Sequence, residues 1–419
     1  MKPKTPKVGI VLSGGGARGA YEAGVVAGII EALGRRAEDK TPFHVISGTS
    51  VGAINGAFLA ANAHRGDVNI HEMLRIWRTL ELSNHLRIDL QGLVGWHRTD
   101  WKRLLGMHEA MPLTDRYGRS LLNPRGLEVA VQGGIDWAQL HKNVDDGVVH
   151  ALVVAALHIG TGVTTMFAEL SPTASFNPTK APRRVAKLER IELEHVLASA
   201  AIPFVFPSRR VGESYFVDGG LRFNTPIAPA IRAGADKLIV VTLRYNRQAG
   251  AVDSEGDVGT GPDMSEQYPH LVFLLGKILN ALLLDPVTYD LQILERFNRL
   301  AEVLDSTLRP AERARIDKVL TETRGQSYRA IETLVFEPSE DIGVMAGEHL
   351  RENLNAWRLG RMYDWALAKA ANVQATWESD LASYLLFDGA FAERLIALGR
   401  RDALAKADRI REFYLDVAR

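Results

Sequence analysis

Cysteine is absent from this 419-residue chain, and that absence removes several kinds of site. Disulfide frameworks, cysteine-ligated metal sites and cysteine nucleophiles all require the thiol group. The 12 histidines show no metal-ligand spacing such as His-Glu-x-x-His, so we expect no metal. A chain without cysteine fits a reducing compartment, and we expect a cytoplasmic protein.

An excess of charge of one sign is also missing. Fifty Lys and Arg residues balance fifty Asp and Glu residues, so the formal net charge is zero. A neutral chain exerts no long-range attraction on nucleic acid, and we expect no nucleic-acid partner. Hydrophobic residues make up 46% of the chain, which is enough for a sizeable core and excludes disorder as the dominant state.

Long hydrophobic runs are missing too. The run Val8–Leu12 is too short for the apolar part of a signal peptide. The most apolar later window, residues 271–284, falls short of the roughly 18–20 residues that a bilayer span needs. We interpret it as a core or dimer helix in preference to an interfacial one. Contact with a membrane is therefore expected only at the surface, as a transient, peripheral interaction.

Basic residues gather between positions 180 and 190, where they could meet anionic lipid headgroups. They are Lys180, Arg183, Arg184, Lys187 and Arg190. Three glutamates at 189, 192 and 194 interrupt and follow the run. We therefore interpret this segment as a solvated helix face.

The first 65 residues alternate between strand and helix patterns. An apolar strand over 8–12 precedes a glycine-rich break and helical spacing up to Leu33; a second strand over 43–46 precedes a small-residue helix over 53–63. This order implies parallel strands covered by helices. Residues 69–101 are expected to be mostly helical. Further strands are expected at 148–157, 162–170, 215–217 and 237–243.

The composition changes after residue 246. Residues 247–270 are rich in Gly, Asp, Ser and Pro, which predicts a mobile surface loop. Residues 271–419 are mainly helical, with helices over 271–284 and 291–308 parted at Asp285-Pro286. One strand returns at 333–336. That returning strand favours a catalytic core over 6–246 with a helical C-terminal elaboration, 271–419, packed on it.

The segment 14–19 reads Gly-Gly-Gly-Ala-Arg-Gly, after a strand and before a helix. Its G-x-G-x-x-G pattern is that of a dinucleotide site, which should have an acidic residue at the end of the next strand. That strand ends in Ile46-Ser47-Gly48, without an acid. The alternative is a turn whose backbone N–H groups bind another anion, including the oxyanion of a transition state.

The segment 48–52 reads Gly-Thr-Ser-Val-Gly at a strand-to-helix junction, the context of a nucleophile elbow. In such a tight turn, Gly48 and Gly52 leave room for Ser50, and the N–H of Val51 points toward an oxyanion. The plainer alternative is that Ser50 only caps the following helix.

A serine hydroxyl needs a base to act as a nucleophile. Beyond residue 218 the chain has only His270 and His349, and neither stands in the strand-end loop where a triad histidine belongs. Asp218, in Asp218-Gly219-Gly220, directly follows a strand. A carboxylate in a dry site can accept the Ser50 proton directly. The plainer alternative is that Asp218 only forms a turn.

These three segments, in this order, resemble the signature blocks of the patatin-like phospholipases. Two supporting blocks, residues 198–203 (Ala-Ser-Ala-Ala-Ile-Pro) and 224–226 (Asn-Thr-Pro), are also similar. The resemblance covers about residues 7–245. It implies a three-layer α/β/α fold with a mainly parallel central sheet.

The resemblance also implies a serine acyl hydrolase that cleaves fatty-acyl esters of lipids through an acyl-enzyme, as a phospholipase A or lysophospholipase. By this carry-over Ser50 is the nucleophile and Asp218 the base of a dyad without histidine. The oxyanion hole is then formed by Gly14, Gly15 and Gly16, together with Val51. Residues supporting the motifs are Arg18, Gly19, Gly48, Gly52, Gly219 and Gly220.

The substrate implied is a lipid or lysophospholipid, and no cofactor is expected. The alternative function is a lipid-binding or regulatory protein with little turnover. Two readings of Arg18 stay open: it faces solvent at the helix start, or it steadies the glycine loop or meets a phosphate headgroup. The sequence also leaves a homo-oligomer open.

Overall fold

The computed structural model describes residues 5–80, 87–88, 122–123, 125–177, 179–203, 205–245, 286–353 and 378–415. Its centre is a nine-stranded sheet. The strands are β1 (Val8–Leu12), β2 (Val45–Thr49), β5 (Ala151–His158), β6 (Thr164–Leu170), β7 (Arg184–Leu188), β8 (Arg209–Val211), β9 (Ser214–Asp218), β10 (Lys237–Val241) and β11 (Glu332–Phe336). A separate two-stranded ribbon joins β3 (Arg87–Ile88) and β4 (Leu122–Asn123).

The strands follow the order β11-β10-β1-β2-β5-β6-β7, and the first five of these are mutually parallel. The second half of the sheet is mixed: β6 is antiparallel to β5, and β7 is parallel to β6. The pair β8–β9 lies off this path, with β9 antiparallel to β5. The sheet is thus mainly parallel in the half that carries the two glycine-rich junctions.

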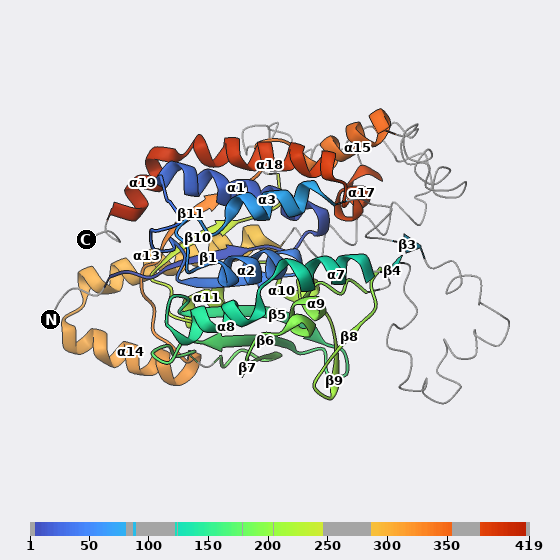
Figure 1. Ribbon diagram of the computed structural model, residues 1–419. Coiled ribbons are helices and arrows are strands. Elements are labelled where there is room, and N and C mark those ends of the chain that lie inside the picture. Colours follow the sequence, from blue (N-terminus) through green and yellow to red (C-terminus); the bar gives the residue numbers. More distant parts are fainter. Residues whose placement is uncertain are drawn as a thin grey trace, which may run out of the picture.

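Successive residues of β1 point to opposite faces of the sheet, as the two-residue repeat of a strand requires. Ile10 and Leu12 belong to one hydrophobic cluster and Val11 to the other. All three side chains are fully buried, because helices cover both faces (Figure 1). This is the three-layer α/β/α arrangement, and it explains why the central strands are continuously apolar.

Most helices cover the face to which Ile10 points. They are α1 (Gly19–Leu33), α2 (Val51–Ala61), α3 (Ile70–Arg78), α7 (Arg125–Gly134), α8 (Trp137–Asp145), α9 (Leu193–Ser199), α15 (Ile342–Asn353), α17 (Glu378–Leu385), α18 (Gly389–Leu404) and α19 (Ala407–Leu415). The face of Val11 is covered by α10 (Gly220–Phe223), α11 (Ile227–Arg232) and α13 (Pro286–Thr307). Helix α14 (Pro310–Arg324) buries no residue.

Helix α18 runs along α1, so the C-terminal part of the chain forms part of the main core (Figure 1). The two helices touch backbone to backbone. A Cβ atom on Gly24 of α1 would collide with the carbonyl of Ile396, and one on Gly399 of α18 would collide with the carbonyl of Tyr21. Such a close approach needs glycine at the crossing.

The expected strands at 8–12, 148–157, 162–170, 215–217, 237–243 and 333–336 are confirmed, with end shifts of a few residues. The expectation for the basic segment was wrong. The basic segment 180–190 is not a helix face, because residues 184–188 form β7, the last strand on its side of the sheet. Charged side chains on such a strand discourage pairing with another molecule, so the charges have a structural reason.

The helix expected over 69–101 is confirmed at α3, but residues 87–88 within it form β3. The helix expected from residue 291 begins earlier, at Pro286. The predicted surface loop over 247–270 and the predicted helix over 271–284 lie outside the described residues.

In the part of the chain that the structure describes, no helix is long and apolar enough to cross a membrane. Within that same part, no group of three or more His, Asp or Glu side chains is placed to hold a metal ion.

Candidate active site

Ser50 lies at the sharp junction between β2 and α2. Its backbone has φ 55° and ψ −127°, a conformation that non-glycine residues rarely adopt and that costs energy. The surrounding packing holds it there. A Cβ atom on Gly48 would collide with the carbonyl of Gly52, and one on Gly52 would collide with the carbonyl of Leu12. The two glycines therefore make the strained turn sterically feasible, and strain of this kind is concentrated at functional sites.

Strand β5 brings Ser50 and Asp218 together. The last residue of β2, Thr49, pairs with Ala155, and the next residue of β5, Ala156, pairs with Asp218 at the end of β9. The nucleophile candidate and the base candidate therefore lie on two sides of one strand at the same level. They are 168 positions apart in the sequence, so this contact depends on the sheet topology alone.

Ser199, at the end of α9, connects the pieces of this junction. Its hydroxyl accepts a hydrogen bond from the Ser50 N–H at 2.9 Å and donates one to the carbonyl of Ala155 at 2.6 Å. The N–H of Asp218 donates to the carbonyl of Ala201, at 2.9 Å. Helix α9 and the turn after it thus fix both the elbow and the strand end that carries the carboxyl group.

Asp218 is completely buried, and burial raises its pKa to about 7. The Ser50 side chain and the Gly220 N–H act in the opposite direction, because they stabilise the carboxylate. The Gly220 N–H donates to Oδ1 at 2.7 Å. The second oxygen, Oδ2, is buried without a hydrogen-bond partner among the described residues. A carboxylate with a pKa near neutrality and an unused oxygen is suited to accept a proton.

The glycine loop lies directly against Ser50. The side chain of Asn224 holds Gly14 with two hydrogen bonds: the Gly14 N–H donates to Asn224 Oδ1 at 3.0 Å, and Asn224 Nδ2 donates to the Gly14 carbonyl at 3.1 Å. The Gly14 N–H also donates to the backbone carbonyl of Asn224, at 3.3 Å. A Cβ atom on Gly14 would lie 2.9 Å from the Cβ of Ser50. Any side chain at position 14 would therefore push the loop and the nucleophile apart.

The backbone donors near Ser50 divide into two groups. The Gly14 N–H is already engaged by Asn224, so this glycine, predicted as part of an oxyanion hole, is occupied as a donor. The N–H groups of Gly15, Gly16 and Val51 find no acceptor in the described part of the chain. Val51 is the first residue of α2, where unpaired N–H groups favour negative charge.

Arg18 does not face solvent, so that alternative was wrong. Its side chain is buried, its Nε donates to Ser383 Oγ at 2.7 Å, and its guanidinium lies 4.3 Å from the centre of the Tyr384 ring. Both partners belong to α17. Gly16, with φ 58°, also packs against the backbone of Tyr384. Arg18 therefore ties the glycine loop to the C-terminal part of the chain.

Glu22, a fully buried carboxyl group on α1, lies outside every motif found in the sequence. Its Oε2 accepts a hydrogen bond from Asn55 Nδ2 at 2.8 Å, and Asn55 Oδ1 accepts one from Trp77 Nε1 at 3.2 Å. Burial raises the pKa of Glu22 to about 8. The only signal in the sequence is that Glu22 is the one charged residue between Gly19 and Ile30, and that signal indicates no role.

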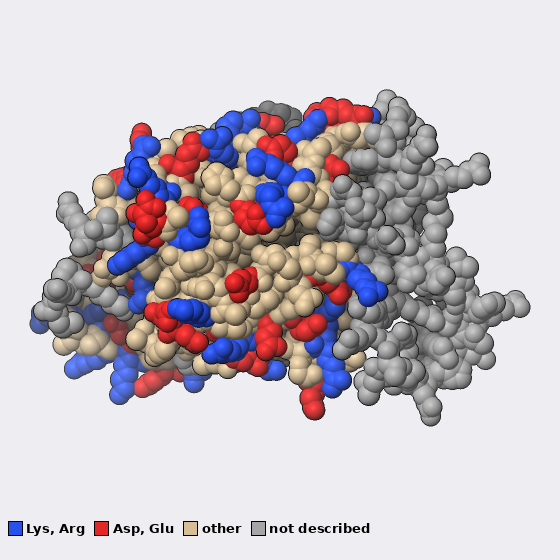
Figure 2. Space-filling model, in the orientation of Figure 1, with Lys and Arg blue, Asp and Glu red and all other residues tan. Residues whose placement is uncertain are grey.

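An apolar cavity of about 60 Å³ borders the residue after the nucleophile. It lies between α2, α3 and α7, where the surface in Figure 2 carries few charges. Its walls include Val51, Phe58, Trp77, Leu80, Val131 and Phe387. Val51 also packs on Gly19, where a Cβ atom would collide with its side chain. The residue after Ser50 thus borders a cavity whose lining is apolar except for Asn55.

Gly219 and the two histidines considered in the sequence analysis remain to be placed. A Cβ atom on Gly219 would collide with the carbonyl of Ala155, so glycine is required where β9 meets β5. His349 is buried far along the chain and pairs with Asp388 at 2.9 Å. It stabilises the packing of α15 on the start of α18. His270 lies outside the described residues.

Comparison with known proteins gives one family. Residues 10–231, slightly more than half of the chain, match the family model described as Patatin-like phospholipase. No curated protein matches the sequence.

Two solved structures are similar at low sequence identity. VipD from Legionella pneumophila is 12% identical, with a TM-score of 0.30, over 94% of this chain and 92% of that chain. Human GIVD cytosolic phospholipase A2, in complex with methyl gamma-linolenyl fluorophosphonate, is 12% identical, with a TM-score of 0.40, over 99% of this chain and 59% of that chain.

Proposed function

The chain belongs to the patatin-like phospholipase family, whose members are lipid acyl hydrolases, and we propose that it cleaves fatty-acyl esters of phospholipids or lysophospholipids. One observation carries the proposal. A serine in a strained elbow lies beside a buried aspartate whose pKa is near 7 and whose second oxygen is unused. That pair has the chemistry needed to attack an ester.

In the first step Ser50 Oγ attacks the ester carbonyl carbon while its proton passes to Asp218. Oδ2 is the acceptor we assign, because Oδ1 already takes the Gly220 N–H. The raised pKa favours this transfer, since a carboxylate of ordinary pKa would be a much weaker base. No histidine takes part in this step.

The carbonyl oxygen becomes an oxyanion in the tetrahedral intermediate. We assign the N–H groups of Gly15, Gly16 and Val51 as its donors, because each is without an acceptor in the described structure. Donors that are fixed before the reaction stabilise charge at no cost of reorganisation. Gly14 and Asn224 then act by holding the loop in place.

The intermediate collapses when the C–O bond to the leaving alcohol breaks and the proton on Asp218 moves to that alcohol. The acyl group is now an ester of Ser50. Water, deprotonated by Asp218, attacks this ester, and the fatty acid leaves as the Ser50 hydroxyl regains its proton. The same carboxyl group therefore serves as base and acid in each half of the reaction.

The polarity of the surface beside the elbow supports a lipid substrate. The cavity that borders Val51 is lined almost entirely by apolar side chains, as the acyl part of a lipid requires. We further propose that the protein is cytoplasmic and meets its substrate by transient contact with a membrane surface. Sedimentation with phospholipid vesicles tests that contact, and a protein that stays in the supernatant at all vesicle concentrations would contradict it.

The experiment that tests the function is an activity screen over fatty-acyl esters that differ in headgroup and chain length. The full-length protein should release fatty acid from at least one phospholipid or lysophospholipid. Ser50→Ala should lower that rate by roughly 10³-fold or more. Ser306→Ala, the same change at an exposed site on α13, serves as the control and should keep the full rate.

Hydrolysis that persists in purified Ser50→Ala would contradict the proposal. Binding of lipid without release of fatty acid from any ester would favour the alternative, a lipid-binding or regulatory protein.

A further inference from the structure

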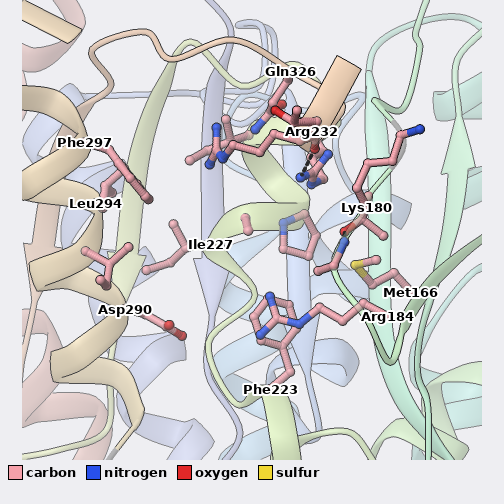
Figure 3. A pocket seen from close by; sticks show the side chains of 18 residues that line it. Met166, Lys180, Arg184, Phe223, Ile227, Arg232, Asp290, Leu294, Phe297 and Gln326 are labelled. Atoms are coloured by element: carbon pink, nitrogen blue, oxygen red, sulfur yellow. Dashed lines mark hydrogen bonds between the residues drawn. The ribbon is translucent and has the colours of Figure 1, made fainter. Parts of the chain in front are cut away.

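A second and larger cavity lies on the opposite side of the sheet from the apolar cavity at Val51. Its volume is about 390 Å³, within the usual range for small-molecule pockets. It is lined by residues of α11, α13 and β7 and of the end of α14. Figure 3 shows Asp290, Leu294 and Phe297 on α13 at one side and Arg184 and Lys180 at the other.

Four cationic side chains line this cavity, against one carboxyl group. The cations are Lys180, Arg184, Arg232 and Arg324, and the carboxyl group is that of Asp290. Among the described residues, no ion pair neutralises Lys180, Arg184 or Arg324. Arg232 is buried, and its guanidinium donates to the carbonyls of Asn177 (3.2 Å) and Arg324 (3.1 Å). The cavity therefore has an excess of positive charge.

The charged groups of this cavity shift one another's pKa values. Burial lowers the pKa of Arg232, and the neighbouring charges of Arg324 and Arg184 lower it further. Burial raises the pKa of Asp290 to about 6, while Arg184 acts in the opposite direction. At pH 7 this carboxylate offsets only one positive charge. Like charges held together in a partly dry cavity repel one another, and a bound anion would relieve that repulsion.

Two of the arginines also stack on aromatic rings. The guanidinium of Arg184 lies 4.3 Å from the centre of the Phe223 ring, and that of Arg324 lies 5.0 Å from the Phe297 ring. Stacking fixes the plane of a guanidinium while leaving its edge N–H groups available for an oxyanion. The rest of the wall is apolar, and includes Ile227 and Leu294.

We propose that this cavity binds an amphiphilic anion. Its carboxylate or phosphate group lies among Arg184, Arg232 and Arg324, and its apolar chain lies along Ile227, Leu294 and Phe297. A free fatty acid and an anionic lysophospholipid share this chemistry. The inference stands on the cavity alone and does not depend on the roles of Ser50 and Asp218.

The test measures binding by calorimetry in full-length Ser50→Ala protein, so that no probe is consumed. Oleate and 1-oleoyl lysophosphatidate, each below its critical micelle concentration, supply the chain with a carboxylate or a phosphate. Inorganic phosphate supplies an anion without a chain, and oleyl alcohol a chain without an anion. Arg184→Gln removes one charge from the cavity. Lys187→Gln, on the other face of β7 beside Phe167 and Phe216, is the matched control.

At least one of the two amphiphiles should bind, and Arg184→Gln should weaken that binding roughly tenfold, the effect of one charge-assisted contact. Lys187→Gln should change it less than about twofold. Inorganic phosphate and oleyl alcohol should each bind at least roughly tenfold more weakly. The amphiphile that binds more tightly identifies the headgroup.

The proposal is overturned if neither amphiphile binds, if Arg184→Gln and Lys187→Gln have the same effect, or if inorganic phosphate binds as tightly as the amphiphiles. Ala228→Phe is a second variant that fills the cavity and keeps every charge. It should abolish binding, and retained affinity in that variant would also overturn the proposal. Thermal melts of both variants show that each is folded.

Discussion

Two cavities of opposite character lie on opposite faces of the sheet. The cavity on the α2 side is small and apolar and borders the residue after Ser50. The cavity on the α13 side is several times larger and is lined by four cations. The first lies beside the site at the ends of β2 and β9, and the second is formed by side chains from four separate segments.

The difference shows two uses of burial. At Asp218, burial raises the pKa of an acid and prepares it to accept a proton. At Arg232, burial and the nearby charges of Arg324 and Arg184 lower the pKa of the guanidinium. A bound anion would stabilise these charged groups. The first arrangement is suited to proton transfer in catalysis, and the second is suited to binding an anion. Changes on the α2 side should therefore affect turnover most.

The largest effect is expected from Asp218→Asn. The amide keeps the shape of the side chain but cannot accept the Ser50 proton, and among the described residues no histidine is hydrogen-bonded to Ser50 or Asp218. We expect the rate of ester hydrolysis to fall by roughly 10³-fold or more. Asp145→Asn, an exposed acid paired with Arg190, is the control and should leave the rate unchanged. A near-normal rate for Asp218→Asn would show that another group is the base.

A smaller loss is expected from Gly14→Ala. The added methyl group would lie 2.9 Å from the Cβ of Ser50 and would clash with Asn224, so the loop must shift. Displaced oxyanion donors should lower kcat roughly 10- to 100-fold. Gly133→Ala, on α7 with open space around it, should leave kcat unchanged. Equal activity of the two variants would remove the role assigned to the loop.

The rate of ester hydrolysis should depend modestly on pH and should increase as pH rises. Asp218 must be ionised to accept a proton, and its pKa is about 7. Activity should therefore rise with pH, with kcat/KM about tenfold higher at pH 8 than at pH 6. A rate that is flat over this range, or that has its midpoint near pH 4, would mean that Asp218 does not control the reaction.

The smallest effect concerns stability, at Glu22. Its folded-state pKa of about 8 lies above the ordinary 4.5, so its contribution to stability is fully present below pH 4.5 and is lost as pH rises toward 8. Glu22→Gln should keep the Asn55 hydrogen bond and should raise the unfolding free energy at pH 8 by roughly 1–3 kcal/mol.

The gain from Glu22→Gln should be smaller at pH 5 than at pH 8. Glu31→Gln, an exposed change on the same helix, should show no such trend. Chemical denaturation at the two pH values checks this. A gain that is the same at pH 5 and pH 8 would mean that the Glu22 carboxyl does not titrate in this range.

The parts that could be predicted are those that depend on short segments. Val8–Leu12 and residues 238–241 are apolar and rich in β-branched residues, and the glycines at 48 and 52 mark the turn between β2 and α2. Each of these features depends on the local backbone conformation and on side chains close in the sequence. It can therefore be predicted without knowledge of the fold. The catalytic roles of Ser50 and Asp218 stay predictions until they are measured.

The parts that could not be predicted depend on distant partners. Arg18 is buried because Ser383, 365 positions away, accepts its hydrogen bond. Residues 184–188 form a strand because β6 pairs with them, although their charges resemble those of a solvated helix. The cationic cavity draws on β7, α11, α13 and α14, and no spacing in the sequence relates these segments.

The central claim is that Ser50 is a nucleophile activated by Asp218. The most direct measurement is reaction with a fluorophosphonate that carries an alkyl chain, followed by peptide mass spectrometry. We predict one adduct, located on Ser50, that forms rapidly in the unmodified protein and at least roughly 10²-fold more slowly in Asp218→Asn. Labelling at a different residue, or equal labelling rates in the two proteins, would contradict the account.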